Sequence, residues 1–167
     1  MINTPILTAI NKQIQHEQGN ARAYQALSLY FGRLNLHGLE AFMAQQAGDE
    51  RVHAEKLIRH VADRGGQVDL ATIPAPKTEF ASPLEAVKSV RDLERATTGT
   101  IHLLFELARK EGDWALEVLL GWYITEQVEE EKWSDELAAL MEQFHDHPGQ
   151  VFMLDHQWGK RIKENEK

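Results

Sequence analysis

Polar side chains interrupt the apolar faces of four predicted helices, each near the middle of its helix. Read at helical spacing, the four faces carry in turn Glu17, then Glu50 and His53, then Glu94, and finally Gln127 and Glu130. Burying one uncompensated carboxylate in an apolar interior is very costly, and burying four together costs more. Since no Lys or Arg falls on these faces, the carboxylates must become protonated, pair with cations or bind metal.

The spacing of these residues repeats in the two halves of the chain. The same separations occur twice: 33 residues from Glu17 to Glu50 and from Glu94 to Gln127, and 36 residues from Glu17 to His53 and from Glu94 to Glu130. Such a repeat indicates two helical hairpins of matching register. It predicts that the polar groups gather around a pseudo-two-fold axis in the core of a bundle.

Four carboxylates and one neutral imidazole would balance the charge of two divalent cations. Carboxylate and imidazole ligands with open coordination positions suit Fe(II) and oxygen chemistry. A Glu-x-x-His pair alone carries little information, because the chain has a second one at Glu142 and His145, which we assign to a solvated helix end. The prediction of a metal site therefore depends on the whole set across four helices.

Capping residues and prolines in the sequence predict the helices that position these polar side chains. We expect Thr4 to cap a helix from Pro5 to about Phe31, Ser82 to cap one ending near Lys110, and Asp113 to cap one ending near Phe144. A further helix should span about residues 39–64. Residues 67–81 contain two prolines and form a long connection, which allows one crossover along a bundle.

A short amphipathic helix is predicted at residues 150–158, followed by a frayed tail at 160–167. We expect Trp114, Trp122 and Trp133 to be core or interface aromatics. The fold predicted is all-α, in a single domain over residues 1–167: a four-helix bundle with a long crossover and a short fifth helix.

The composition of the chain excludes several classes of protein. The chain has 167 residues, no cysteine and a net charge of −8, which exclude a disulfide scaffold and a cysteine nucleophile and argue against a nucleic-acid partner. No apolar run is long enough to cross a membrane and no secretory signal is visible, so we expect a cytoplasmic protein.

These motifs resemble those of the bacterial non-haem ferritins over nearly the whole chain. The resemblance is carried by Trp122-Tyr123-Ile-Thr-Glu126-Gln127-Val-Glu129-Glu130-Glu131-Lys132, by Glu17 with Tyr24 seven residues later, and by Asp49-Glu50-Arg-Val-His53. It implies a ferroxidase that uses O2 or H2O2 to oxidise Fe(II). It also implies that copies of this 167-residue chain form a hollow 24-subunit cage that stores ferric mineral.

The resemblance also implies residue roles. Glu17, Glu50 and His53 match the ligands of a first iron, with Glu50 bridging to a second iron held by Glu94 and Glu130. Gln127 lies beside the second iron, and Tyr24 supplies an electron during oxidation. A third iron site, flanking the pair, is implied at Asp49, Glu126, Glu129 and Glu130.

The sequence departs from the family pattern at two positions and differs from the haem-binding relatives at a third. Asp49 stands where a glutamate is usual, Leu93 where a histidine is common, and Arg51 where the haem-binding relatives have their methionine ligand. The resemblance therefore implies no haem. Two alternatives stay open at this stage: another di-iron oxidase or peroxidase of the same fold, such as a rubrerythrin-like protein, and an inert structural bundle.

Overall fold

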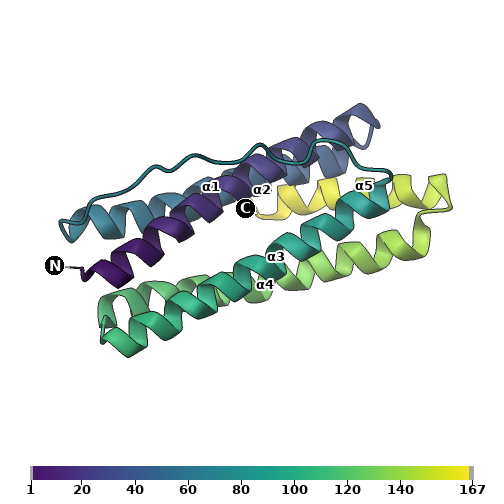
Figure 1. Cartoon of the computed structure of the whole chain (residues 1–167). Coiled ribbons are helices and arrows are strands. Elements are labelled where there is room, and N and C mark those ends of the chain that lie inside the picture. Colours follow the sequence, from purple (N-terminus) through teal and green to yellow (C-terminus); the bar gives the residue numbers. More distant parts are fainter. Residues whose placement is uncertain (1, 166–167) are drawn as a thin grey trace.

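Five helices make up the fold. The structure is a computed structural model that describes residues 2–165, and within that range it contains no β-strand. The helices are α1 (Thr4–Arg33), α2 (His37–Asp63), α3 (Pro83–Glu111), α4 (Trp114–Phe144) and α5 (Pro148–Asn165). The first four form a bundle of two antiparallel hairpins, α1–α2 and α3–α4 (Figure 1). The predicted all-α bundle is thereby confirmed.

Side-chain caps fix where three helices begin. Ser82 and Asp113 cap α3 and α4 as predicted, each accepting a hydrogen bond from the backbone N–H three residues later. The prediction for α1 was wrong by one residue, because Asn3, rather than Thr4, is the cap. Proline at either of the first two helical positions is compatible with a helix start, so Pro5 does not distinguish these registers.

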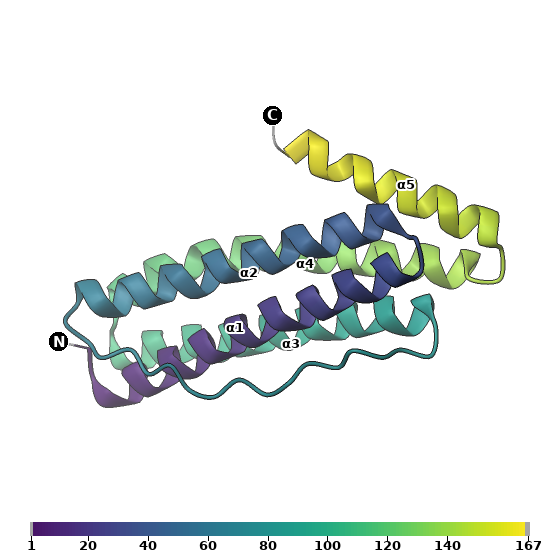
Figure 2. The ribbon, with the colours of Figure 1, turned by 90° about the horizontal axis from the view of Figure 1, so that it is seen from above.

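The crossover between α2 and α3 runs the length of the bundle (Figure 2). Side chains of α1 hold it. The Asn11 amide donates to the carbonyl of Gln67 (3.2 Å), and the Gln15 amide one turn later donates to that of Thr72 (2.6 Å). Arg33 makes a similar contact near the far end of the crossover. Because this connection spans the bundle, α3 starts at the opposite end from where α2 stops.

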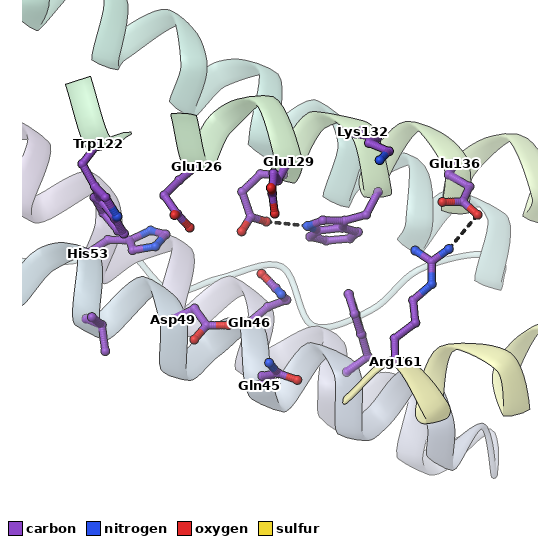
Figure 3. Close-up of a pocket in the computed structure, with 14 residues that line it drawn as sticks. Gln45, Gln46, Asp49, His53, Trp122, Glu126, Glu129, Lys132, Glu136 and Arg161 are labelled. Atoms are coloured by element: carbon purple, nitrogen blue, oxygen red, sulfur yellow. Dashed lines mark hydrogen bonds and ion pairs between the residues drawn. The ribbon is translucent and has the colours of Figure 1, made fainter. Parts of the chain in front are cut away.

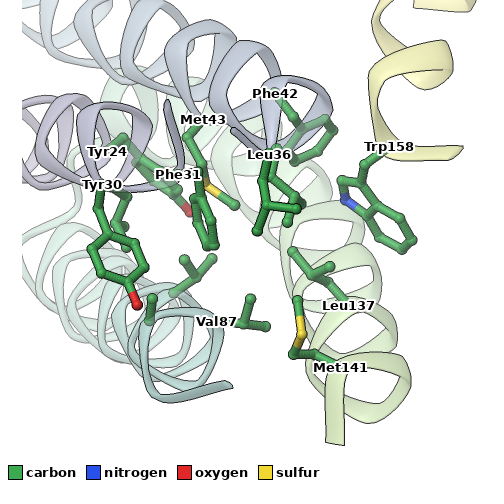
Figure 4. Close-up of a cluster of buried hydrophobic side chains, with 14 of the residues drawn as sticks. Tyr24, Tyr30, Phe31, Leu36, Phe42, Met43, Val87, Leu137, Met141 and Trp158 are labelled. Atoms are coloured by element: carbon green, nitrogen blue, oxygen red, sulfur yellow. The ribbon is translucent and has the colours of Figure 1, made fainter. Parts of the chain in front are cut away.

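The apolar core is divided into two clusters. One fills the end of the bundle near α5 (Figure 4), and the other fills the end near the N-terminus. The first includes Phe31, Phe42 and Trp158, and the second includes Ile10 and Leu120. Along each of the four bundle helices, the buried polar side chains of the predicted faces lie between the residues of one cluster and those of the other. This apolar packing at both ends fixes the four helices around a polar middle layer.

Helix α5 is longer than predicted and caps another helix. The expected frayed segment is helical as far as Asn165, with residues 166–167 outside the described range. The Asp155 carboxylate accepts a hydrogen bond from the backbone N–H of Leu39 (2.7 Å), near the start of α2. A Cβ at Gly38 would lie 1.9 Å from the Asp155 carbonyl oxygen, so this contact requires glycine.

Of the three tryptophans predicted to be core or interface aromatics, one is not in the core. Trp114, at the first position of α4, is 73% exposed and contributes nothing to the core of the single chain. Trp122 and Trp133 are half-buried, in keeping with packing roles. Among the described residues, no helix combines the length and apolar character needed to cross a bilayer.

Candidate metal centre

Three of the predicted residues form a compact buried group between α1 and α2. One ligand atom each from Glu17, Glu50 and His53 lies within 4.8 Å of the other two. Helix α1 supplies Glu17, and one turn of α2 supplies Glu50 and His53, which share a helix face because they are three residues apart. All three side chains are buried, and Glu17 is 0% exposed.

The hydrogen bonds of this group leave two carboxylate oxygens free. The Gln13 amide donates to Glu17 Oε1 (2.7 Å), and the Asn20 amide donates to Glu50 Oε1 (3.2 Å). Glu17 Oε2 and Glu50 Oε2 are buried with no hydrogen-bond partner among the described residues. Buried polar atoms are almost always satisfied. Two buried carboxyl oxygens without a hydrogen-bond partner, one of them 3.4 Å from His53 Nδ1, therefore fit a cation as the missing partner.

Glu94 of α3 joins the layer from the other hairpin. Its carboxylate accepts a hydrogen bond from the Tyr24 hydroxyl on one oxygen and from the Gln127 amide on the other (3.3 Å). Glu94, Tyr24 and Gln127 are all buried. The two residues predicted to act beside the metals thus contact a predicted ligand directly. Glu94 does not belong to the compact group of three.

Glu130 of α4 lies at the edge of the layer. It is half-buried, and its Oε2 accepts a hydrogen bond from the Trp133 indole N–H (2.6 Å). Like Glu94, it lies outside the compact group of three.

Burial and mutual repulsion hold protons on these carboxyl groups. Burial is the largest cause of the rise in pKa, to about 8 for both Glu50 and Glu130, and the charges of neighbouring carboxylates add to it. The pKa of Glu17 is raised well above its ordinary value by burial and by Glu50. Burial likewise raises the pKa of Glu94. When no metal is present, the surroundings of these carboxyls therefore do not compensate the charge of all four.

A cavity of about 550 Å³ opens beside this layer, between α2 and α4. Figure 3 shows Glu126 and Glu129 of α4 facing Asp49 and His53 of α2 across it. Glu130 also lines the cavity. The four residues of the implied third site thus share one space. Burial raises the pKa of Asp49.

Four supporting residues were missed by the sequence reasoning. Gln13 and Asn20 hold the carboxylates of the compact group, Tyr123 donates to the backbone carbonyl of His53 (2.5 Å), and Trp133 contacts Glu130. For three of these residues, the sequence spacing could have indicated the contact. Gln13 and Trp133 lie one helical turn from a predicted ligand, and Asn20 lies one turn beyond Glu17, so each shares a face with a carboxylate.

The fold and this geometry define a class: a four-helix bundle with a buried carboxylate–histidine group in its core that could hold a metal ion. A family model described as a ferritin-like domain matches residues 7–144. The bacterial non-heme ferritin of Staphylococcus aureus (strain USA300) is 31% identical over 166 residues, covering 99% of this chain and 100% of that protein. That of Staphylococcus haemolyticus (strain JCSC1435) is 40% identical over 131 residues, covering 78% and 79%.

Comparison with solved structures indicates the same family. The open-pore ferritin of the hyperthermophilic archaeon Archaeoglobus fulgidus superposes with a TM-score of 0.92 at 33% identity, covering 95% of this chain and 98% of that one. The chain belongs to the ferritin family.

Proposed function

We propose that this chain is the subunit of an iron-storage ferritin that oxidises Fe(II) at two adjacent sites in the bundle core. The observation that carries the proposal is the buried group of Glu17, Glu50 and His53 with its unpartnered oxygens. Family membership and the names of the relatives support the same function.

In this proposal, the compact group and Glu94 with Glu130 hold the two irons. Glu17, Glu50 and His53 bind one Fe(II), Glu94 and Glu130 bind the other, and Glu50 bridges them. The net charge of −8 attracts Fe(II) toward the protein. Binding replaces the protons that the raised pKa values of Glu50 and Glu130 retain near neutral pH.

Oxidation then requires an acceptor of two electrons. Each Fe(II) gives up one electron, and O2 takes both electrons with two protons to become H2O2. Where H2O2 is the oxidant, two electrons and two protons convert it to two waters. The carboxylates favour the harder Fe(III) product. Tyr24, hydrogen-bonded to Glu94, would replace one Fe(II) as electron donor where only one iron is bound, so that the oxidant still receives two electrons.

The cavity beside the centre gives the product a way out. Asp49, Glu126 and Glu129 offer oxygen ligands there next to Glu130. We assign to them a third, transient iron site between the paired sites and the mineral store. Twenty-four copies of the chain would enclose that store, in the cytoplasm, with no haem and as single-domain subunits.

The test is rapid-mixing absorbance after Fe(II) is added to the aerobic, iron-free protein. Glu50→Ala and Glu130→Ala should each slow the fast oxidation phase more than about 100-fold, since losing a residue that merely supports a ligand costs roughly 10- to 100-fold. Both variants should still assemble. An unchanged fast phase in either variant would reject the assignment.

Glu142→Ala provides the matched control. Glu142 belongs to the second Glu-x-x-His pair of the chain, but it is exposed and pairs with Lys88 (2.8 Å). This variant loses one glutamate from α4, as Glu130→Ala does, and should oxidise Fe(II) at the wild-type rate.

A further inference from the structure

Trp133 makes a polar contact that its place in the core does not require. Its indole N–H donates to Glu130 Oε2 at 2.6 Å, from one helical turn further along α4. An N–H donor to a carboxylate forms a charge-assisted hydrogen bond, which is shorter and stronger than a neutral one. The indole engages Oε2 and leaves Oε1 of Glu130 for a metal.

Glu130 needs such a contact because its surroundings repel it. The carboxylates of Glu94, Asp49 and Glu126 all lie close enough to disfavour its charge. It is half-buried beside an open cavity, so its side chain has room to turn toward solvent. The hydrogen bond from the Trp133 N–H favours the ionised form of Glu130 and holds Oε2 at 2.6 Å from the indole nitrogen.

The indole is itself held on two sides. The ring of Phe42 on α2 meets it edge to face, with centroids 4.9 Å apart, and the ring of Tyr24 on α1 lies tilted at 6.5 Å. A side chain packed between two other helices cannot change rotamer without disturbing both. The direction of the N–H is therefore fixed by the bundle.

Helix α5 supports the position of the Trp133 indole through contacts with Phe42 and with α4. Trp158 is fully buried and packs edge to face on Phe42, with centroids 6.3 Å apart. Arg161 lies over the Trp158 ring (4.0 Å) and pairs with Glu136 of α4 (2.7 Å), one turn beyond Trp133. A continuous set of contacts thus connects α5 through Phe42 and Trp133 to Glu130.

We propose that Trp133 is a positioning residue for Fe(II) binding and oxidation: its indole N–H orients Glu130, and docked α5 supports the indole through Phe42. The inference rests on the proposed function, because it assumes that Glu130 binds iron. It adds a residue that binds no metal itself and gives α5 a role at the centre.

The experiment titrates the whole, iron-free protein with Co(II) under anaerobic conditions and follows the d–d absorption bands. Co(II) reports ligand geometry without being oxidised. Trp133→Phe keeps an aromatic ring between Phe42 and Tyr24 but removes the N–H. It should weaken one of the two bound Co(II) per subunit by about tenfold or more, the usual cost of losing a ligand's supporting contact. The other Co(II) should bind as in the wild type.

Kinetics supply a second readout. The KM for Fe(II) in the fast phase should rise by about the same factor in Trp133→Phe. The rate at saturating Fe(II) should change much less. A fall in that rate with no change in KM would contradict a positioning role.

Trp158→Phe is the matched control. Trp158 packs against the same Phe42, but its N–H is buried without a hydrogen-bond partner among the described residues. The same substitution there removes no hydrogen bond and keeps an aromatic ring against Phe42, through which α5 supports the indole. Both Co(II) should therefore bind as in the wild type. Equal weakening in both variants, or no weakening in Trp133→Phe, would overturn the inference. Wild-type protein that fails to bind two Co(II) in the bundle would overturn the proposed function, and the inference with it.

Discussion

At the scale of single residues, the proposed metal site lowers the stability of the metal-free protein. Glu17, Glu50, Glu94 and Glu130 approach one another in a largely buried layer, where burial and repulsion raise their pKa values. Removing one partner from a cluster of like charges relieves repulsion instead of leaving a charge alone. Functional sites commonly lower stability in this way.

The raised pKa values predict how the stability of the metal-free protein depends on pH. The carboxyls of Glu50 and Glu130 have pKa values of about 8 in the folded protein, whereas in the unfolded chain they ionise near the ordinary glutamate value. Between these values the folded state binds more protons, so the contribution of these two groups to stability is greatest below the unfolded pKa and is lost as the pH rises toward 8. Scanning calorimetry in a chelator should show the melting temperature falling across this window.

Glu130→Gln should stabilise the metal-free protein and flatten this pH dependence. We expect a gain of about 1 to 3 kcal/mol near pH 8, in line with the replacement of other buried ionic groups. Glu142→Gln, at an exposed position, should change neither quantity. A loss of stability in Glu130→Gln would show that the Glu130 charge is favourable without metal, against this account.

At the scale of elements, helix α5 contacts both α2 and α4, and its closest approach is to the start of α2. Asp155 caps the start of α2, where the residue before the helix offers no side-chain cap of its own. The backbones of α2 and α5 approach so closely that a Cβ at Gly159 would lie 3.0 Å from Gly38 Cα. The N-terminus of α2 and the docking of α5 thus depend on each other.

Gly38→Ala should therefore weaken the docking of α5. The added methyl group meets the Asp155 carbonyl oxygen, and overpacking of this kind costs about 1 to 3 kcal/mol. Hydrogen exchange should speed up in α5 and in the first turn of α2. Gly48→Ala, in the same helix with open space around it, should be neutral or stabilising by about 0.5 to 1 kcal/mol. Unchanged exchange in Gly38→Ala would contradict the close contact.

The sequence predicts the elements better than their contacts. Helical periodicity and the caps Ser82 and Asp113 depend on neighbouring residues, so pattern alone predicts them. The repeated spacing likewise indicates which carboxylates share the layer. The hydrogen bond from Leu39 to Asp155 joins residues 116 positions apart, and no local pattern encodes it. The hydrogen bond from the Trp133 N–H was not predicted, because helical periodicity explains an aromatic residue on an apolar face by packing alone.

At the scale of the whole molecule, the candidate site is complete within one chain, and storage depends on assembly. Each described ligand candidate comes from α1 to α4 of the same subunit. The surface carries large apolar side chains, including Trp114 (73% exposed) and Val118 (80% exposed) near the start of α4. Exposed apolar side chains that cluster together are typical of surfaces that contact another protein.

We predict that the purified protein sediments as a particle many times the 19.1 kDa mass of the chain. After aerobic loading it should hold far more irons than two per subunit. Analytical ultracentrifugation combined with iron analysis makes the measurement. A small oligomer with about two irons per subunit would instead favour an oxidase or peroxidase of the same fold. An iron-free particle would favour a structural role.

The central claim is that two irons bind between the carboxylates of the middle layer. Crystals soaked in Fe(II) without oxygen, with anomalous data collected at the iron edge, test it directly. The account predicts two peaks in each subunit, one contacting Glu17, Glu50 and His53 and the other contacting Glu50, Glu94 and Glu130. Iron peaks confined to the surface, with the middle layer empty at saturating Fe(II), would contradict it.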